Sequence, residues 1–302
     1  MIFPLQRIIL IVYSLSMTIA VRNKTRLAVI SIAALIFFIS ALSVFSILQA
    51  GKLNSYKGLN LSKNFESILS ASIPEFLQNS QFMKYSTAAV CFSIFACSGF
   101  SLIVLIYIYF TFKKTHAIEI SFFIAFIFSI EFESLRLIFP LYTFSSIVLE
   151  NIASISRLIY FFRLAGVAAL FISSIFATKI ITRQIFYVMF FSTFIAFSVI
   201  ISIPINNFNI NRYFIADIKY SYSYTFIILA LIILTCVNYF FVYIAKNAKE
   251  YLSAAAMIGV LSFGYMVLLY SSSFFSLIMA GMFFLAGTFF YIKNIHGYHL
   301  WE

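Results

Sequence analysis

Long, uninterrupted runs of apolar residues are the dominant pattern along the chain. A helix needs about 20 mainly apolar residues to cross the hydrocarbon core of a bilayer, and eight runs meet this requirement. They are rich in Phe, Ile, Leu, Ser and Ala and lack the period-two alternation of a membrane β-barrel. The runs lie near 27–49, 86–112, 118–142, 157–177, 185–205, 223–245, 251–271 and 273–292. The pattern predicts an all-α, polytopic membrane helix bundle with eight transmembrane helices.

The composition agrees with this prediction and excludes a water-soluble domain. Of the 302 residues, 63% are hydrophobic and only 10% are charged, whereas a soluble domain carries about 25% charged residues. Such a chain has too few polar side chains to cover a fold in water. Because the chain has only three cysteines, a disulfide-stabilised scaffold is excluded as well.

The spacing of the apolar runs divides the chain into five parts. Residues 1–26 form an N-terminal segment for which we favour a helix lying on the inner membrane surface, while a short ninth span, a mis-assigned start and a signal peptide stay open. The first span, 27–49, precedes an outer loop, 50–85, where helical spacing of apolar residues predicts an amphipathic helix. A seven-helix bundle follows over 86–292, and residues 293–302 are expected to form a cytoplasmic tail.

Basic residues near the span ends predict the orientation. Lys and Arg in short loops favour the cytoplasmic side, and Arg22, Lys24, Arg26, Lys113 and Lys114 all lie beside spans. Eight spans with both termini in the cytoplasm place every short basic loop inside. We therefore expect a multi-pass protein of a bacterial inner membrane. The net charge of +11 then reflects topology and not nucleic-acid binding, which needs a basic patch on a folded surface.

Charged residues inside two predicted spans are the strongest functional signal. Glu131, Glu133 and Arg136 fall in the third span, and Arg157 and Arg163 fall in the fourth. Charged side chains within a bilayer are costly and usually face the protein interior with a partner. The two spans run antiparallel, and Arg136 and Arg163 each lie about 9 Å from the outer end of their helix at 1.5 Å per residue. We expect the two arginines at the same depth.

Helical spacing predicts how these charges pair. Glu133 and Arg136 are three positions apart and share a face. Glu131 points to nearly the opposite side, where Arg163 is the candidate partner. Two acids against three bases leave an excess of positive charge. Three interpretations follow: an ion network that fixes the helix pair, a site for an anionic ligand or lipid headgroup, and an ion or proton relay.

Small and polar residues on later spans predict close packing. Ala165, Ala169 and Ser173 recur every four positions on the fourth span, which lets a neighbouring backbone approach closely. Asn238, in the sixth span, is expected to face the interior.

The sequence favours no enzyme. Glu131, Glu133 and Arg136 are similar to the glutamate-pair and arginine motif of the CAAX-type intramembrane proteases. In that family, however, the two acids are adjacent, whereas Phe132 separates them here, and histidines lie on later membrane helices. All three histidines of this chain lie outside the predicted spans. We therefore predict no catalytic residues, no cofactor and no metal site.

Three functional classes fit these observations. The first is a sensor or binding module, because the layout resembles the seven-helix membrane regions of bacterial sensor proteins; it would act through a separate cytoplasmic or membrane partner. The second is a transporter or a lipid-handling, flippase-like protein. Because the four prolines fall at span ends or outside spans, we expect unbroken helices, which are less typical of transporters. The third is a structural subunit of an envelope complex. Besides the lipid bilayer, an anionic lipid or a small anion is the expected partner.

Overall fold

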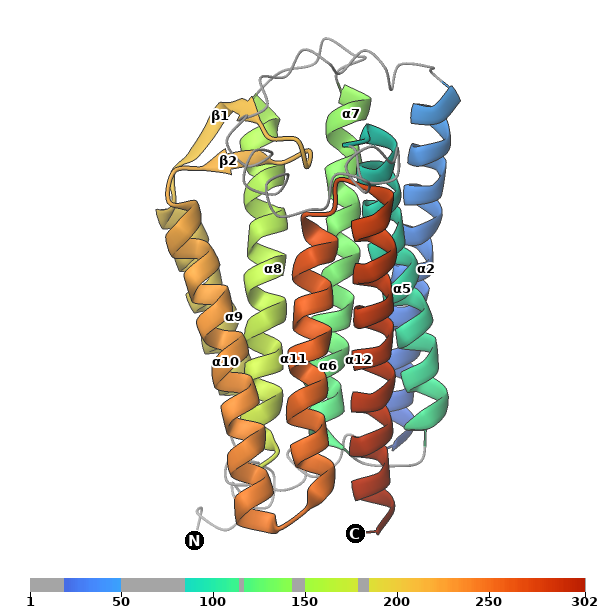
Figure 1. Ribbon diagram of the computed structural model, residues 1–302, viewed down its shortest axis with the longest axis vertical. Coiled ribbons are helices and arrows are strands. Elements are labelled where there is room, and N and C mark those ends of the chain that lie inside the picture. Colours follow the sequence, from blue (N-terminus) through green and yellow to red (C-terminus); the bar gives the residue numbers. More distant parts are fainter. Residues whose placement is uncertain (1–18, 50–84, 114–116, 143–149, 179–184, 302) are drawn as a thin grey trace, which may run out of the picture.

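The computed structural model describes residues 19–49, 85–113, 117–142, 150–178 and 185–301. These residues form a bundle of long helices that run side by side, with a two-stranded hairpin at one end (Figure 1). We call this end the hairpin end. The opposite end, where the last helix of the chain finishes, is called the base.

Helices account for nearly all of the described residues. In chain order the elements are α2 (Ile19–Gln49), α5 (Thr87–Thr111), α6 (Ile118–Glu131), the 3₁₀ helix η2 (Phe132–Leu137), α7 (Ile138–Tyr142), α8 (Glu150–Phe176), α9 (Ile185–Ser202), β1 (Ile205–Ile210), β2 (Ala216–Ile218), α10 (Ser221–Lys246), α11 (Lys249–Leu269) and α12 (Phe274–Trp301).

Six of the described helices are long and apolar enough to cross a membrane: α2, α5, α8, α10, α11 and α12. They confirm the predicted helical membrane bundle and indicate a multi-pass membrane protein. The two other predicted spans also correspond to helices, but α9 is shorter and the run 118–142 is divided among α6, η2 and α7. The count of eight spans stays a prediction, as do the side on which the termini lie and the identity of the membrane.

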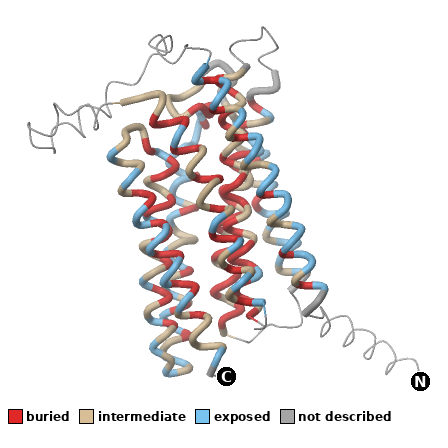
Figure 2. Tube along the Cα trace, turned by 90° about the vertical axis from the view of Figure 1, so that its right-hand side faces the viewer, coloured by how far each residue is buried: buried red, intermediate tan, exposed pale blue. Residues whose placement is uncertain are grey.

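Apolar side chains fill the interior of the bundle and also cover much of its outside. Buried positions follow the inward faces of the helices, and exposed positions follow the outward faces (Figure 2). Phe38 on α2, Phe110 on α5 and Phe226 on α10 are 64%, 72% and 70% exposed. Such surfaces are unfavourable in water and stable against lipid chains.

The ends of the chain differ in part from the prediction. Residues 19–26, which were expected in a separate N-terminal segment, belong to α2, and residues 293–301, which were expected in a tail, continue α12. Residues 1–18 and the predicted amphipathic helix within 50–84 lie outside the described residues. The helix α2 is longer than expected because Arg22 and Arg26 are buried against its neighbours instead of ending the helix.

The third predicted span is not a uniform α-helix, so the expectation of unbroken helices is wrong there. It changes to a 3₁₀ helix over Phe132–Leu137 before α7 begins. The hydroxyl of Ser134 donates to the carbonyl oxygen of Glu131 at 2.7 Å, a local bond that competes with regular helical hydrogen bonding. A 3₁₀ stretch within a helix often marks a functional hinge or a strained sequence. Here it carries Glu133 and Arg136.

Glycines bring α11 and α12 into close contact. A Cβ atom on Gly264 would lie 2.5 Å from the backbone nitrogen of Phe284, and one on Gly287 would lie 2.6 Å from that of Leu261. The two backbones therefore pack directly against each other, as small residues allow within membranes.

The small residues of the fourth predicted span pack as expected only in part. Ala169 and Ser173 are buried on α8, whereas Ala165 is half-buried. The closest approach to α6 is made by Gly166, because a Cβ there would overlap the hydroxyl of Ser129. Asn238, as expected, faces a neighbouring helix and donates to the hydroxyl of Ser174 on α8 at 3.1 Å.

A β-hairpin links α9 to α10 and folds onto the bundle. Its strands are antiparallel, with Ile205 opposite Ile218 and Ile210 opposite Ala216. The side-chain oxygen of Asn211 accepts from the backbone N–H groups of Tyr213 and Ile215 at 3.0 and 3.3 Å, which is the local bonding typical of asparagine in turns. The turn directs the buried residues 214–216 toward the helices.

Candidate functional site

A buried ion network lies where the hairpin meets the bundle. The carboxylate of Glu133, on η2, accepts from Arg163 of α8 through both oxygens: Oε1 lies 2.6 Å from Nε and Oε2 lies 2.7 Å from Nη2. Arg136 adds a third bond from Nη1 to Oε2 at 3.3 Å. The exposed fractions of Glu133, Arg136 and Arg163 are 1%, 0% and 3%. The paired geometry of Arg163 is the strong, two-point form of carboxylate recognition.

The second cation of the network is held by the hairpin. Nε and Nη2 of Arg136 both donate to the backbone carbonyl oxygen of Tyr213, at 2.8 and 2.5 Å. Arg136 therefore has a carboxylate on one side and a hairpin carbonyl on the other. This arrangement accounts for the excess positive charge that the sequence predicted, because a neutral carbonyl oxygen takes the place expected for an anion.

Tyrosines connect α8 to both the network and the hairpin. The hydroxyl of Tyr160 donates to the carbonyl oxygen of Ala216 at 3.0 Å, and its ring lies 5.4 Å from the guanidinium carbon of Arg163. Tyr224, on α10, donates to the carbonyl oxygen of Tyr160 at 3.0 Å. Ser156 accepts from the N–H of Ala216 at 3.1 Å. The hairpin, the ion network and the start of α10 therefore form one connected set of contacts.

Groups at the edge of the hairpin complete its attachment. The hydroxyl of Tyr85 donates to the carbonyl oxygen of Arg212 at 3.3 Å. Burial raises the pKa of Tyr85 to about 12, although the Arg212 guanidinium opposes the shift. Burial likewise raises the pKa of Tyr213. Both tyrosines therefore stay protonated at neutral pH, so Tyr85 keeps the proton that it donates.

The predicted pairing was right for one acid and wrong for the other. Glu133 does contact Arg136, but Arg163 pairs with Glu133 and not with Glu131. Residues three apart are aligned in a 3₁₀ helix, so Glu133 and Arg136 lie on one face, and Arg163 meets that face instead of the one that carries Glu131. Arg157 was also predicted to join the cluster; it is exposed on α8 and makes no contact with the network among the described residues.

Glu131 is fully buried beside the network without belonging to it. Its residue exposure is 0%, and neither carboxyl oxygen has a hydrogen-bond partner. The hydroxyls of Ser98 and Ser101, on α5, lie next to the carboxyl group, but the Ser101 proton is donated to the carbonyl oxygen of Ile127 at 2.8 Å. An isolated carboxylate is very costly in such a place, so this group carries either a proton or a bound cation.

A second buried polar cluster, absent from the sequence analysis, lies toward the base. Tyr251 donates to Glu119 Oε1 at 3.0 Å, and His299 Nε2 lies 3.9 Å from the same oxygen. The hydroxyl of Tyr239 lies 2.9 Å from those of both Ser173 and Tyr291. Glu119 was overlooked because it stands at the edge of an apolar run, where a lone acid is typical of a loop. The tyrosines were overlooked because their spacing along separate helices carries no motif.

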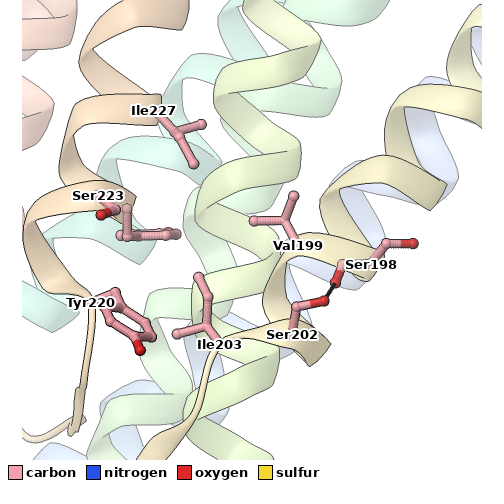
Figure 3. A pocket seen from close by; sticks show the side chains of 8 residues that line it. Ser198, Val199, Ser202, Ile203, Tyr220, Ser223 and Ile227 are labelled. Carbon is pink, nitrogen blue, oxygen red and sulfur yellow. Dashed lines mark hydrogen bonds between the residues drawn. The ribbon is translucent and has the colours of Figure 1, made fainter.

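An open groove lies between α9 and α10 at the hairpin end. It has a volume of about 510 Å³ and is mainly apolar, with Val199, Ile203 and Ile227 facing it together with several hydroxyl groups (Figure 3). Tyr224 also lines it. Both helices pack against α8, so the groove opens outward between them. Through Tyr224 it adjoins the contacts that hold the hairpin.

The described residues contain no group of three or more His, Cys, Asp or Glu side chains that could hold a metal ion. Cys91, Cys97 and Cys236 are free thiols within helices. The buried carboxyl groups of this part of the chain are Glu133 in the ion network, Glu131 beside it and Glu119 toward the base.

Comparison with known proteins identifies one relative without a known activity. An uncharacterized protein of Treponema pallidum (strain Nichols) is 31% identical to this chain over 191 residues, which are 60% of this chain and 55% of that protein. The chain thus spans about half the length of this relative. No known protein family matches the chain, and no solved structure matches it. The contacts and burial of the described residues are therefore the basis for a functional proposal.

Proposed function

We propose that this protein is a membrane-embedded sensor or binding module whose hairpin reports on a ligand held at the hairpin end. The observation that carries the proposal is the position of Arg136. It is completely buried and joins Glu133 of the third span to the Tyr213 carbonyl of the hairpin. A movement of the hairpin therefore changes the partners of a buried charge, and a change in the ion network releases or holds the hairpin.

The groove between α9 and α10 is the proposed ligand site. Its apolar walls and scattered hydroxyls suit a lipid-like amphiphile that enters from the bilayer, in keeping with the mainly apolar lining of small-molecule sites. Tyr224 lines the groove and also donates to Tyr160, which contacts both Ala216 and Arg163. Occupation of the groove would thus reach the hairpin through two side chains. A separate partner protein would receive the signal.

An anion at the ion network itself is less favoured by the geometry. The guanidinium nitrogens of Arg136 are already bonded to Glu133 and to the Tyr213 carbonyl. An anionic headgroup would have to displace the hairpin to reach them. Such competition would be a second way to move the hairpin.

Two substitutions at adjacent positions of α10 test whether the groove binds a lipid. Ile227→Trp fills the groove, whereas Phe226→Trp alters a side chain that is 70% exposed on the adjacent position. Each variant and the wild type are purified in mild detergent, and the retained lipids are measured by mass spectrometry. We expect an amphiphile that is retained by the wild type and Phe226→Trp and lost from Ile227→Trp. Identical lipid content in all three proteins would refute the groove as the site.

The sensor role needs a second measurement on the same proteins. Hydrogen exchange at residues 211–218 reports whether the hairpin is docked. The wild type should show different exchange at these residues with and without bound lipid. Ile227→Trp should show the same exchange in the presence and absence of lipid, equal to that of one of the two wild-type states. If exchange at the hairpin does not depend on lipid, the protein binds without sensing.

Cation- or proton-coupled transport is a second candidate, favoured by Glu131. Transporters often interrupt their helices near the substrate, and the α-to-3₁₀ change begins immediately after this unpaired carboxyl group. Proton uptake into liposomes that contain the purified protein tests this candidate. We expect uptake that Glu131→Gln abolishes and Glu250→Gln, at the half-buried start of α11, leaves intact.

A further inference from the structure

A pair of buried arginines lies at the base, far from the ion network. Arg22 and Arg26 are one turn apart on α2 and share a face. Their exposed fractions are only 6% and 5%. Lys24, between them in sequence, is exposed. In the sequence, all three residues indicate only the orientation of the chain.

Most of the donor groups of this arginine pair have no acceptor. Nη1 of Arg26 donates to the carbonyl oxygen of Phe112, at the end of α5, at 2.8 Å. The other two nitrogens of Arg26 and all three side-chain nitrogens of Arg22 are buried without a hydrogen-bond partner. Five guanidinium nitrogens are thus buried without a hydrogen-bond acceptor among the described residues.

No carboxylate among the described residues forms an ion pair with either arginine. The charged group that acts most strongly on Arg26 is Arg22 itself, which repels it. His296, on α12, adds a further polar atom: its ring packs edge-on against Phe112 at 5.1 Å, and its Nδ1 is buried without a partner. Two like charges that are buried without a counter-charge are unfavourable. The arginine pair therefore lacks a counter-charge among the described residues.

The chemistry and the location both favour phosphate. Guanidinium groups bind phosphate oxygens through two parallel hydrogen bonds. Arg22 and Arg26 lie near the base end of a helix whose following turns are apolar and largely exposed, including Leu27 at 53% and Leu35 at 61%. A lipid phosphate on the arginines would bring the acyl chains to the apolar outer surface of the bundle, of which these leucines form part. Basic pockets at membrane surfaces bind anionic lipids in this manner.

We propose that Arg22 and Arg26 form a binding site for a phosphate group, supplied by the headgroup of an anionic lipid. The site is separate from the groove and does not depend on the sensor function proposed above. It would anchor α2 to α5 in the presence of the lipid, because Arg26 already contacts the end of α5.

The test compares two single-charge losses on the same helix. Arg22→Gln removes an arginine whose side chain has no hydrogen-bond partner among the described residues, and Lys24→Gln removes an exposed lysine two positions away. Lipid binding is measured by native mass spectrometry during titration with phosphatidylglycerol, phosphatidylcholine or inorganic phosphate. We expect wild type and Lys24→Gln to bind phosphatidylglycerol preferentially and Arg22→Gln to bind it about tenfold more weakly.

The other outcomes are equally informative. Binding of inorganic phosphate that Arg22→Gln abolishes would support the phosphate site and show that the free ion suffices. Equal losses in Arg22→Gln and Lys24→Gln would overturn the proposal, because attraction would then be a general effect of charge. No preference of the wild type for phosphatidylglycerol or phosphate would overturn it as well.

A measurement on the wild type alone guards against misfolding of the variants. Phenylglyoxal modifies accessible guanidinium groups, and peptide mapping locates the modified residues. Because Arg22 is only 6% exposed, its modification requires local opening, and bound phosphatidylglycerol should slow that modification relative to phosphatidylcholine. The exposed Arg157 should react equally in both lipids. Unchanged labelling of Arg22 in the two lipids would contradict the site.

Discussion

At the scale of single residues, Glu133 has the greatest influence on the molecule. It is the one described carboxylate that contacts both Arg136 and Arg163. Its neighbour Glu131 shows the contrast, because it is equally buried but has no hydrogen-bond partner. Two acids separated by one residue thus have different roles: Glu133 neutralises the arginines, and Glu131 is free to bind a proton or a cation.

Replacing Glu133 by Gln should destabilise the bundle strongly. The change leaves Arg136 and Arg163 buried without a counter-charge, and breaking a buried ion pair in this way costs about 3–5 kcal/mol. The thermal midpoint in detergent measures the effect. Glu250→Gln, which also removes one acid but at a half-buried position, should change the midpoint little. A thermal midpoint of Glu133→Gln equal to that of the wild type would show that the ion network does not stabilise the fold.

Some of the buried polar residues could be predicted from the sequence, and others could not. The buried charges 131–136 were identified because charges within an apolar run are rare. The second partner of Arg136 was not identified, because the backbone carbonyl of Tyr213 has no signature in the sequence. Glu119 and Tyr251 were missed for a related reason: they belong to different helices, 132 positions apart, and only the folded bundle brings them together.

At the scale of elements, the third predicted span and the hairpin form the adaptable part of the structure. The apolar runs predicted every helix of the described bundle, because length and hydropathy are enough to identify a membrane helix. They could not predict the change to a 3₁₀ helix over Phe132–Leu137, which arises from local hydrogen bonds and buried charges. Nor could they predict the hairpin between α9 and α10, which is held by hydrogen bonds to single residues of the helices. Elements fixed by bulk hydrophobicity were predictable, and those fixed by individual polar contacts were not.

The packing of α11 against α12 can be tested with two glycines. Gly264→Ala would place a methyl group 2.5 Å from the backbone nitrogen of Phe284, whereas a Cβ on Gly297 would meet nothing within 4 Å. Overpacking of this kind costs about 1–3 kcal/mol, so Gly264→Ala should lower the thermal midpoint. Gly297→Ala should leave the midpoint unchanged or raise it, since alanine favours helix by about 1 kcal/mol. Equal effects of the two substitutions would show that the helices separate easily.

The docking of the hairpin should depend on pH through Asp217. Partial burial raises the pKa of this carboxyl above its ordinary value of 3.8, although its hydrogen bond from Asn211 opposes the shift. The docked hairpin therefore binds the proton more tightly than the released one. Docking should weaken as the pH rises from 3.8 through the raised pKa and strengthen as the pH falls through the same window.

Hydrogen exchange at residues 211–218 measures this dependence when wild type and Asp217→Asn are compared at each pH. The variant corrects for the intrinsic effect of pH on exchange, because it lacks the titrating group. The protection of the wild type relative to the variant should increase toward acid pH. A constant ratio over the window would mean that Asp217 titrates alike in both states.

At the scale of the whole molecule, the two polar clusters on the third predicted span define two levels. Glu119 and Glu133 are fourteen residues apart, which is about 21 Å along a helix at 1.5 Å per residue. The Glu119 cluster lies toward the base and the Glu133 network lies under the hairpin. Between them the core is built mainly of aromatic and aliphatic side chains such as Phe123, Phe126 and Ile127. A signal or an ion that passes between the levels has to cross this apolar layer.

The whole molecule should be oriented with its base toward the cytoplasm and its hairpin end toward the outside. The base carries Arg22, Arg26 and Lys246, and the basic residues of short loops favour the cytoplasm. A reporter fused after Glu302 should therefore show a cytoplasmic location, and a cysteine introduced by Lys219→Cys, at an exposed hairpin position, should react with an impermeant thiol reagent added outside. The hairpin would then face the compartment from which a ligand or partner arrives, while the arginine pair would face the anionic inner leaflet. Reporter and hairpin on the same side would mean that the chain crosses the membrane an even number of times between the hairpin and Glu302, and not once through each of α10, α11 and α12.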